Sequence, residues 1–536
     1  MTLPRSRIYA LLMSAATAAL LFSFVVYLIY AANLLSFPYD YDQGEGFELH
    51  DTVLYSRFQL PYGDTESYPF YGSIYPPLFH VMAAPFVWFF GPAYWYGRLL
   101  GFLGSLLSAA AIYYAVCRDG RGNRWIALLS ALAFLSSNFV YHIGPLYRQH
   151  TMMVTFETLA VVVLAGAFPR RCKRGIAIGI LFLICAGYTK QLAAFTALAA
   201  FAWMFLRQPG RALRCLLVFA LAGAAVFLWL NIATDGQWWL QTIVANVNDI
   251  ILDQAFGLLI LWVKLHGLLL IPAALLIIYE LYLDRLSLYS VWFVFSALLG
   301  SIAASKWGAG DSYFVTSIAA ACILSGIFFS RILANDWRLP RQIGKTTMIK
   351  IANASLIIVP LLYLGYARAT LKMPTAGAFA PLAAALGVEG NVREDFYDSA
   401  TFFVGGYARI GYLLGADDRA AGDEITRLIV AADGPVLSEE AGFALAAGRD
   451  VVGNPAQLRN LHLAGRFDGS QLIEMIDGGE FGIIVLRAHF YPPPVLHAIA
   501  RRYEQTHTIH MNGFDYMILH PKALDDGSAR SVGNSG

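Results

Sequence analysis

Long apolar runs separated by short polar segments dominate the first 369 residues of the chain. A bilayer-spanning helix needs about 20 predominantly apolar residues, and eleven runs approach or exceed that length. The first run is longer than the roughly 7–15 apolar residues of a secretory signal, so we expect it to be a retained anchor. The predicted spans are 8–32, 93–117, 125–141, 151–168, 175–188, 191–206, 214–233, 257–282, 287–304, 313–330 and 350–368.

Positive charges alternate along the chain between one set of loops and the other. Arg5 and Arg7 precede the first span, whereas Arg57, Arg148 and Lys190 fall on the opposite side. Because basic loops stay in the cytoplasm, we expect a cytoplasmic N-terminus and a multi-pass protein of the cell inner (plasma) membrane. With eleven spans, everything after residue 368 then lies outside. The basic loops are 117–124, 169–175, 207–214, 283–287 and 330–350.

The remainder of the chain is more polar and mixes two kinds of pattern. Short apolar runs at 434–440, 481–487 and 515–521 indicate strands, and helical spacing appears between them. We therefore predict a transmembrane domain at 1–369, a small extracytoplasmic α/β domain at 370–525 and a disordered tail at 526–536. We expect the α/β domain to affect acceptor choice or stability more than chemistry. The helical segments are 456–465, 470–479 and 495–503.

Composition supports a polytopic α-helical membrane protein. The chain is 58% hydrophobic and 14% charged, whereas soluble domains average about 25% charged residues. A net charge of +2, with basic residues confined to short clusters, excludes a nucleic-acid partner. The sequence also contains no GxGxxG and no P-loop, so it offers no nucleotide-binding motif.

Polar residues of several kinds gather on the predicted outer face. The first outer loop, 33–92, is acidic, and further polar clusters occur at 72–80, 141–151, 187–191 and 305–314. A carboxylate base, cations for a leaving phosphate and aromatic rings against a sugar or prenyl chain suit chemistry on a lipid-borne phosphate. The acidic residues of the loop are Asp40, Asp42, Glu45, Glu48 and Asp51.

Simpler roles exist for each of these residues. Loop acids can be merely solvated, Arg148 and Lys190 can extend to lipid headgroups, and Tyr75 can belong to an aromatic belt. Three other functions also fit parts of the pattern: a transporter or flippase of lipid-linked sugars, a membrane sensor, and a polymerase or ligase of lipid-linked glycans. Transporters place their sites near the midplane of the bilayer, whereas these clusters lie at its outer boundary.

An ordered set of motifs resembles the GT-C superfamily of membrane glycosyltransferases, close to the protein mannosyltransferase and aminoarabinose transferase type (glycosyltransferase family 39). The resemblance covers nearly the whole chain. It departs from the family at His150 and Val315, where relatives often have carboxylates. The motifs are DQGEG at 42–46, YPPL at 75–78, RQH at 148–150, TKQ at 189–191, a GA…YF pattern at 308–314, and VLSE, AGR and NP in the tail.

The resemblance implies a reaction and roles for individual residues. The enzyme would move a sugar from a polyprenyl-phosphate carrier to an acceptor hydroxyl of a lipid, glycan or protein on the extracytoplasmic face, in contact with membrane lipids. The first-loop carboxylates would act as base or bind a divalent cation, and these two roles are not separable. The sugar, acceptor and linkage stay open. The implied catalytic residues are Asp42 and Glu45, and the implied substrate-binding residues are Lys190, Arg148, His150, Tyr75, Gln191 and Tyr313.

Overall fold

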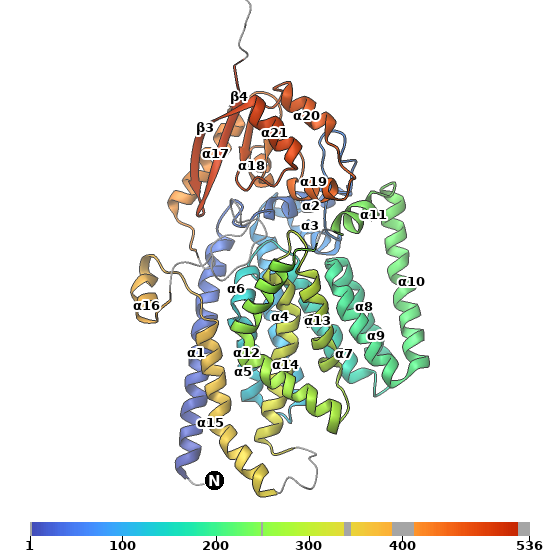
Figure 1. Ribbon diagram of the computed structural model, residues 1–536, viewed down its shortest axis with the longest axis vertical. Helices are drawn as coiled ribbons and strands as arrows, with labels where there is room; N and C mark the ends of the chain where they lie inside the picture. The colour runs from blue at the N-terminus through green and yellow to red at the C-terminus, as the bar shows by residue number, and fades with distance from the viewer. Residues whose placement is uncertain (1–2, 248–249, 337–344, 389–411, 524–536) are drawn as a thin grey trace, which may run out of the picture.

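A computed structural model describes residues 3–247, 250–336, 345–388 and 412–523. An upright bundle of long helices carries a small α/β domain at one end, and the N-terminus lies at the other end (Figure 1). The bundle helices are α1 Leu3–Leu35, α4 Trp95–Asp119, α5 Arg124–Ser136, α6 Asn138–Ile143, α7 His150–Ala167, α8 Lys173–Thr189, α9 Ala194–Arg207, α10 Pro209–Ala233, α12 Leu252–Leu283, α13 Leu288–Ala303, α14 Val315–Leu333 and α15 Lys345–Ala369.

Each predicted span falls on a helix of the bundle, so the polytopic helical prediction is confirmed. Among the described residues, seven helices are long and apolar enough to cross a membrane, and shorter apolar helices lie beside them. The third span differs, because α5 ends at Ser136 and α6 follows an extended Ser137. Ser and Asn side chains compete for backbone hydrogen bonds, and the Ser137 hydroxyl lies 2.8 Å from Nε2 of His266 in α12.

A row of glycines on α4 brings the chain before α7 unusually close. Gly97, Gly101 and Gly104 are spaced so that they share one face of the helix. A Cβ atom on Gly101 would lie 2.6 Å from the Leu146 carbonyl oxygen, and one on Gly104 would lie 2.8 Å from the Thr151 backbone. No side chain fits at these contacts. The glycine row therefore fixes segment 144–151, which carries two predicted site residues.

The first outer loop forms a layer between the bundle and the α/β domain (Figure 1). It contains helix α2 Glu45–Ser56 and helix α3 Leu78–Phe90. Arg98 of α4 anchors the start of the loop from below, because its guanidinium donates to the carbonyl oxygens of Leu34, Phe37 and Tyr39 at 2.6–2.7 Å. The loop is therefore a packed structural layer and is not a solvated connection.

The α/β domain contains one four-stranded sheet in the order β1-β2-β4-β3. Strands β1 and β2 are parallel, with Val436 opposite Ile483, and β4 pairs antiparallel with both β2 and β3. Its elements are α17 Ala416–Ala431, β1 Val436–Ser438, α18 Ala441–Ala446, α19 Pro455–Leu463, α20 Ser470–Asp477, β2 Ile483–Leu486, α21 Pro493–Arg502, β3 Tyr503–Met511 and β4 Phe514–Pro521. The short helix α16 Ala380–Ala385 lies at the level of the bundle, away from the sheet (Figure 1).

The three predicted strands and the three predicted helices of this domain are confirmed. Strand β3 was not predicted, because exposed polar residues occupy most of its length and hide the alternation of a half-buried strand. Pairing with β4 supplies its backbone hydrogen bonds. The predicted tail at 526–536 lies outside the described residues.

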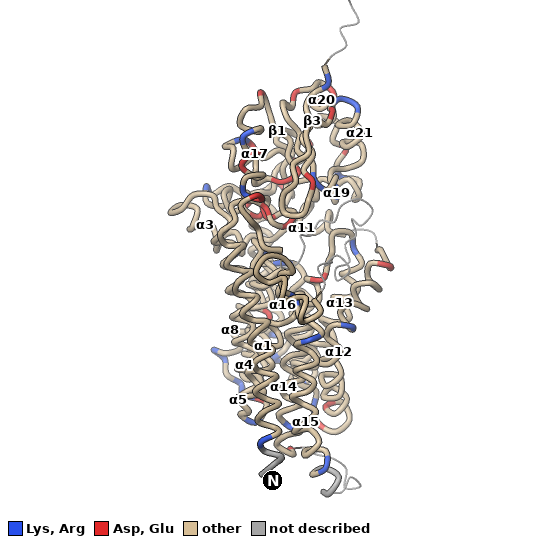
Figure 2. The backbone as a smooth tube through the Cα atoms, turned by 90° about the vertical axis from the view of Figure 1, so that its left-hand side faces the viewer, with Lys and Arg blue, Asp and Glu red and all other residues tan. Residues whose placement is uncertain are grey.

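Charge is distributed unevenly along the long axis. The basic loops of the bundle lie toward the end that holds the N-terminus, away from the α/β domain (Figure 2). This arrangement is the one that the alternation of basic loops along the sequence indicates.

Candidate active site

A cavity of about 520 Å³ lies where the bundle, the first outer loop and the α/β domain meet. The bundle contributes residues of the loops before α7, after α8 and before α14, and the α/β domain contributes Asn454, Asn460 and Phe490. Seven of the eight predicted site residues line it. They are Asp42, Tyr75, Arg148, His150, Lys190, Gln191 and Tyr313.

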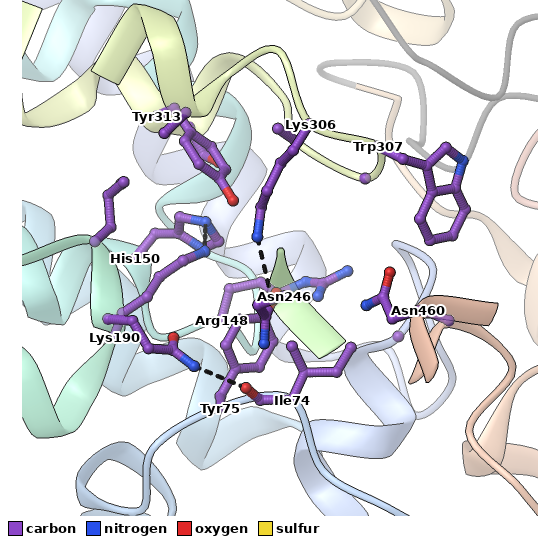
Figure 3. Close-up of a pocket in the computed structure, with 18 of the residues that line it drawn as sticks. Ile74, Tyr75, Arg148, His150, Lys190, Asn246, Lys306, Trp307, Tyr313 and Asn460 are labelled. Carbon is purple, nitrogen blue, oxygen red and sulfur yellow. Dashed lines mark hydrogen bonds between the residues drawn. The ribbon is translucent and has the colours of Figure 1, made fainter. Parts of the chain in front are cut away.

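One end of the cavity is strongly basic. The Lys190 ammonium hydrogen-bonds Nε2 of His150 and lies 4.9 Å from the ring centre of Tyr75 and 5.3 Å from that of Tyr313 (Figure 3). Lys306 points toward the same space and donates to Oδ1 of Asn246 at 3.2 Å. Lys306 was not among the predicted site residues, although it belongs to the polar cluster at 305–314.

The cations at this end disfavour one another. Burial, followed by the charges of Lys306 and Arg148, holds the pKa of Lys190 well below its ordinary value. Burial also lowers the pKa of Lys306 to about 8. An anion bound among these groups would favour their charged forms. The basic end is therefore suited to a phosphate.

Asp42 is one of the carboxylates that line the cavity. Its Oδ2 accepts a hydrogen bond from Nη2 of Arg148 at 2.9 Å, whereas its Oδ1 has no hydrogen-bond partner among the described residues. Burial raises the pKa of Asp42, and the charge of Arg148 opposes that rise. A buried carboxylate with one free oxygen can accept a proton from a bound hydroxyl.

Gly44 explains why a glycine follows Asp42 so closely. It precedes α2 with φ of 92°, in the left-handed region that glycine adopts at little cost. A Cβ atom there would approach Nη2 of Arg148 to 3.2 Å. This residue therefore allows the loop to turn sharply and the Arg148 guanidinium to reach Asp42.

Glu45, predicted as a second catalytic residue, does not line the cavity. Its oxygens pair with Arg98 at 2.8 and 3.0 Å and accept the backbone N–H of Tyr147 and of Tyr41. Burial raises the pKa of Glu45, but the Arg98 ion pair outweighs burial and leaves it below its ordinary value. Glu45 therefore does not contact the cavity, and its contacts instead hold the first outer loop against Arg98 and the backbone of Tyr147. A charged Arg98 within an apolar run was the signal for such a buried partner.

Glu48, one turn after Glu45 in α2, lines the cavity together with Asp51. It lies 3.6 Å from Nη1 of Arg148 and 3.3 Å from Nε2 of His80, and burial raises its pKa to about 8. Ligand atoms of Glu48, Asp51 and His80 lie within 4.8 Å of one another, and all three residues are buried. Nε2 of His80 and Oε2 of Glu48 have no hydrogen-bond partner among the described residues. Two carboxylates and an imidazole form a donor set that a divalent cation accepts.

This cluster is a candidate cation site different from the one that the sequence suggested. Asp42 and Glu45 were the expected ligands, but Glu45 is occupied by Arg98. Asp51 is held instead by the hydroxyls of Tyr71 at 2.8 Å and Ser73 at 2.5 Å, and burial raises its pKa to about 7. The sequence showed each of these residues but could not show that the segments of α2 and α3 meet.

Gln191 has a structural contact as well as a place on the wall. Its Nε2 donates to the carbonyl oxygens of Ile74 at 2.9 Å and Thr242 at 3.0 Å. These two bonds tie the first outer loop to the segment after α10. Gln191 therefore shapes the cavity beside Tyr75.

No protein-family model and no curated protein sequence matches this chain. Among solved structures, ArnT from Cupriavidus metallidurans is similar both in its apo state and bound to undecaprenyl phosphate. Each comparison has a TM-score of 0.56 at 13% identity and covers 94% of this chain and 98% of that chain. The oligosaccharyltransferase of Archaeoglobus fulgidus, tethered with an acceptor peptide, has a TM-score of 0.50 at 12% identity and covers 93% of this chain and 74% of that chain. Over 93–94% of its length, the chain therefore shares the fold of these two proteins.

Proposed function

We propose that this chain is a membrane glycosyltransferase that moves a sugar from a polyprenyl-phosphate carrier to an acceptor hydroxyl. The observation that carries the proposal is the cavity, which is lined by Asp42 together with Lys190 and Lys306. Oδ1 of Asp42 has no hydrogen-bond partner among the described residues. The similar structures support the same class of donor, because one ArnT structure is bound to undecaprenyl phosphate. The tethered acceptor peptide of the oligosaccharyltransferase concerns that protein, and the acceptor of this chain stays open.

The donor phosphate would bind at the basic end of the cavity. Lys190, Arg148 and Lys306 offer charge-assisted hydrogen bonds to phosphate oxygens. The cavity continues along apolar side chains of Ile143 and Ile302, which can contact the start of a prenyl chain. The phosphate therefore stays at the membrane boundary while the tail remains in lipid.

Asp42 would act as the general base. Its Oδ1 takes the proton from the acceptor hydroxyl as that oxygen bonds to the anomeric carbon of the sugar. The bond between that carbon and the phosphate oxygen breaks, and the carrier phosphate leaves with the electron pair. Lys190, Arg148 and Lys306 stabilise the negative charge that develops on it. A cation held by Glu48, Asp51 and His80 would add positive charge beside the cavity.

The orientation of the chain is part of the proposal. We infer that the N-terminus is cytoplasmic and that the α/β domain is extracytoplasmic. The basic loops support this orientation, because they lie at the end of the bundle that holds the N-terminus (Figure 2). Acceptors would then reach the cavity from outside.

Replacing Lys190 tests donor binding. Purified protein in nanodiscs is titrated with undecaprenyl phosphate, and we expect Lys190→Ala to bind it about 10–100-fold more weakly, since a hydrogen bond to a charged group contributes about 1.5–3 kcal/mol. Lys264→Ala removes an exposed lysine from α12 and should leave the affinity unchanged. Equal affinity of the wild type and Lys190→Ala would show that this lysine does not hold the phosphate.

A further inference from the structure

The loop that carries Asp42 is held from above by the α/β domain. Gly46 in the first turn of α2 and Gly442 in the first turn of α18 approach backbone to backbone: a Cβ atom on Gly46 would lie 2.4 Å from the Gly442 nitrogen. A Cβ atom on Gly442 would in turn lie 2.2 Å from Oδ2 of Asp40. The two domains therefore meet without room for a side chain, four residues from Asp42.

A second contact comes from the end of the β3–β4 hairpin. Nδ2 of Asn512 donates to the carbonyl oxygen of Tyr41 at 2.5 Å, directly before Asp42 in the chain. The backbone N–H of Asn512 donates to Oδ1 of Asp418 in α17 at 2.7 Å. This asparagine therefore connects the catalytic loop to two elements of the α/β domain.

A buried ion pair forms the third contact. Nε of Arg487, just after β2, lies 2.9 Å from Oε1 of Glu440, and Oε2 of Glu440 accepts from the Gly44 N–H at 3.4 Å. Both side chains are 1% exposed, and the Arg487 guanidinium lies 4.3 Å from the ring centre of Phe514. The charge of Arg487 also lowers the pKa of Asp42, against the larger effect of burial.

Glu439 extends this arrangement to the cavity wall. Its carboxylate accepts the backbone N–H of Arg487 at 2.6 Å, of Ala488 at 2.7 Å and of Phe490. Phe490 lines the cavity and lies 5.8 Å from the ring of Trp307, which lines it as well. One turn of the α/β domain therefore supports the ion pair and part of the cavity.

We propose that Glu440, Arg487 and Asn512 are positioning residues for Asp42, so that the α/β domain is part of the catalytic unit. The proposal rests on the proposed role of Asp42 as base, and it replaces the expectation that this domain serves mainly acceptor choice or stability. A buried ion pair is weak evidence for stability, because a neutral pair of similar volume is often as stable. Its position against the Gly44 N–H indicates that it keeps the Asp42 loop in one conformation.

Hydrogen exchange of the full chain in nanodiscs tests this proposal. The double variant Glu440→Gln, Arg487→Met removes both charges with little change in volume, so we expect the sheet to keep its protection. Backbone amides at 41–47 should exchange at least about tenfold faster than in the wild type, because the segment is no longer held by the ion pair of Glu440 and Arg487. Asn512→Ala should loosen the same segment without changing the ion pair.

Arg501→Gln is the matched control, because it breaks an exposed ion pair of the same domain, 2.8 Å from Asp477. It should change exchange at 41–47 by less than about twofold. A positioning role also predicts a lower kcat for both test variants with unchanged affinity for undecaprenyl phosphate, a split that general unfolding would not produce.

The outcomes separate this proposal from the proposed function. Unchanged exchange at 41–47 in Asn512→Ala and in the double variant would overturn the positioning role. If the sheet of the double variant lost protection, the exchange rate at 41–47 in Asn512→Ala alone would decide whether the positioning role holds. Faster exchange at 41–47 in a protein that releases no polyprenyl phosphate from any donor would leave the positioning role standing and contradict the transfer reaction.

Discussion

Asp42, Glu45 and Glu48 lie within seven residues of one another, but they differ in their hydrogen-bond partners, their access to the cavity and their pKa. Glu45 is paired with Arg98, whereas Asp42 lines the cavity and its Oδ1 has no hydrogen-bond partner among the described residues. Glu48 also lines the cavity, and burial raises its pKa to about 8. Environment thus separates three similar side chains into a positioning residue, a base and an acid that favours its protonated form when no cation is bound.

The raised pKa of Glu48 predicts a pH dependence of stability. Its value rises from 4.5 to about 8 on folding. Below about pH 4.5 the carboxyl is protonated in both states, and above that the unfolded chain loses the proton first. Stability contributed by the neutral form is therefore lost as pH rises toward 8.

Removing that titration should flatten the profile. In EDTA, the apparent melting temperature of Glu48→Gln should fall less between pH 5 and pH 8 than that of the wild type. Glu424→Gln, at an exposed position of α17, should keep the wild-type slope. Parallel slopes for all three proteins would mean that Glu48 ionises normally in the folded state.

At the scale of elements, the sequence predicted those features that depend on neighbouring residues alone. Span positions follow from apolar runs, and Asp42 and Lys190 follow from polar residues next to helix ends. Glu48, His80 and Lys306 required knowledge of how α2, α3 and the loop before α14 meet. The long polar strand β3 was missed for a similar reason, because its stability comes from pairing with β4.

The glycine row on α4 carries a second prediction. Gly104→Val should displace the start of α7, since even a Cβ atom at this position would lie 2.8 Å from the Thr151 backbone. Arg148 and His150 lie just before Thr151, so we expect weaker binding of undecaprenyl phosphate. We also expect the free energy of unfolding to fall by about 1–3 kcal/mol, which lowers the apparent melting temperature.

Gly267→Val on α12 is the control for that substitution, because no atom of the described residues lies within 4 Å of a Cβ atom there. It should keep both the affinity and the melting temperature. Wild-type behaviour of Gly104→Val would show that the close approach of α4 and α7 is not needed to place Arg148.

At the scale of the whole molecule, the cavity exists only where three parts meet. The bundle supplies the cations, the first outer loop supplies the carboxylates, and the α/β domain supplies Asn454, Asn460 and Phe490. Chain segments more than 400 residues apart thus share one site, which a reading of local motifs cannot assemble. The proposed reaction requires that this junction face the outer side of the membrane, from which the acceptors arrive.

Labelling of single cysteines tests that orientation. Ser470 is exposed in the α/β domain, and Cys172 is a native exposed cysteine in a basic loop. An impermeant maleimide should label Ser470→Cys in intact cells, in a chain without other cysteines. A chain that keeps only Cys172 should be labelled after the cells are broken. The reverse pattern would place the cavity on the cytoplasmic side and contradict the proposed route of the acceptor.

The most direct test of the proposed reaction is the release of polyprenyl phosphate by purified Asp42→Asn. The protein is given a panel of polyprenyl-phosphate sugars and a cell-envelope extract that supplies acceptors, so the measurement does not depend on knowing either sugar or acceptor. Asp42→Asn keeps the size of the side chain and removes the base, and we expect turnover to fall about 10²–10⁴-fold while undecaprenyl phosphate still binds. Asp253→Asn, at an exposed position of α12, should match the wild type. Release by Asp42→Asn at the wild-type rate would contradict the assignment of Asp42 as the base.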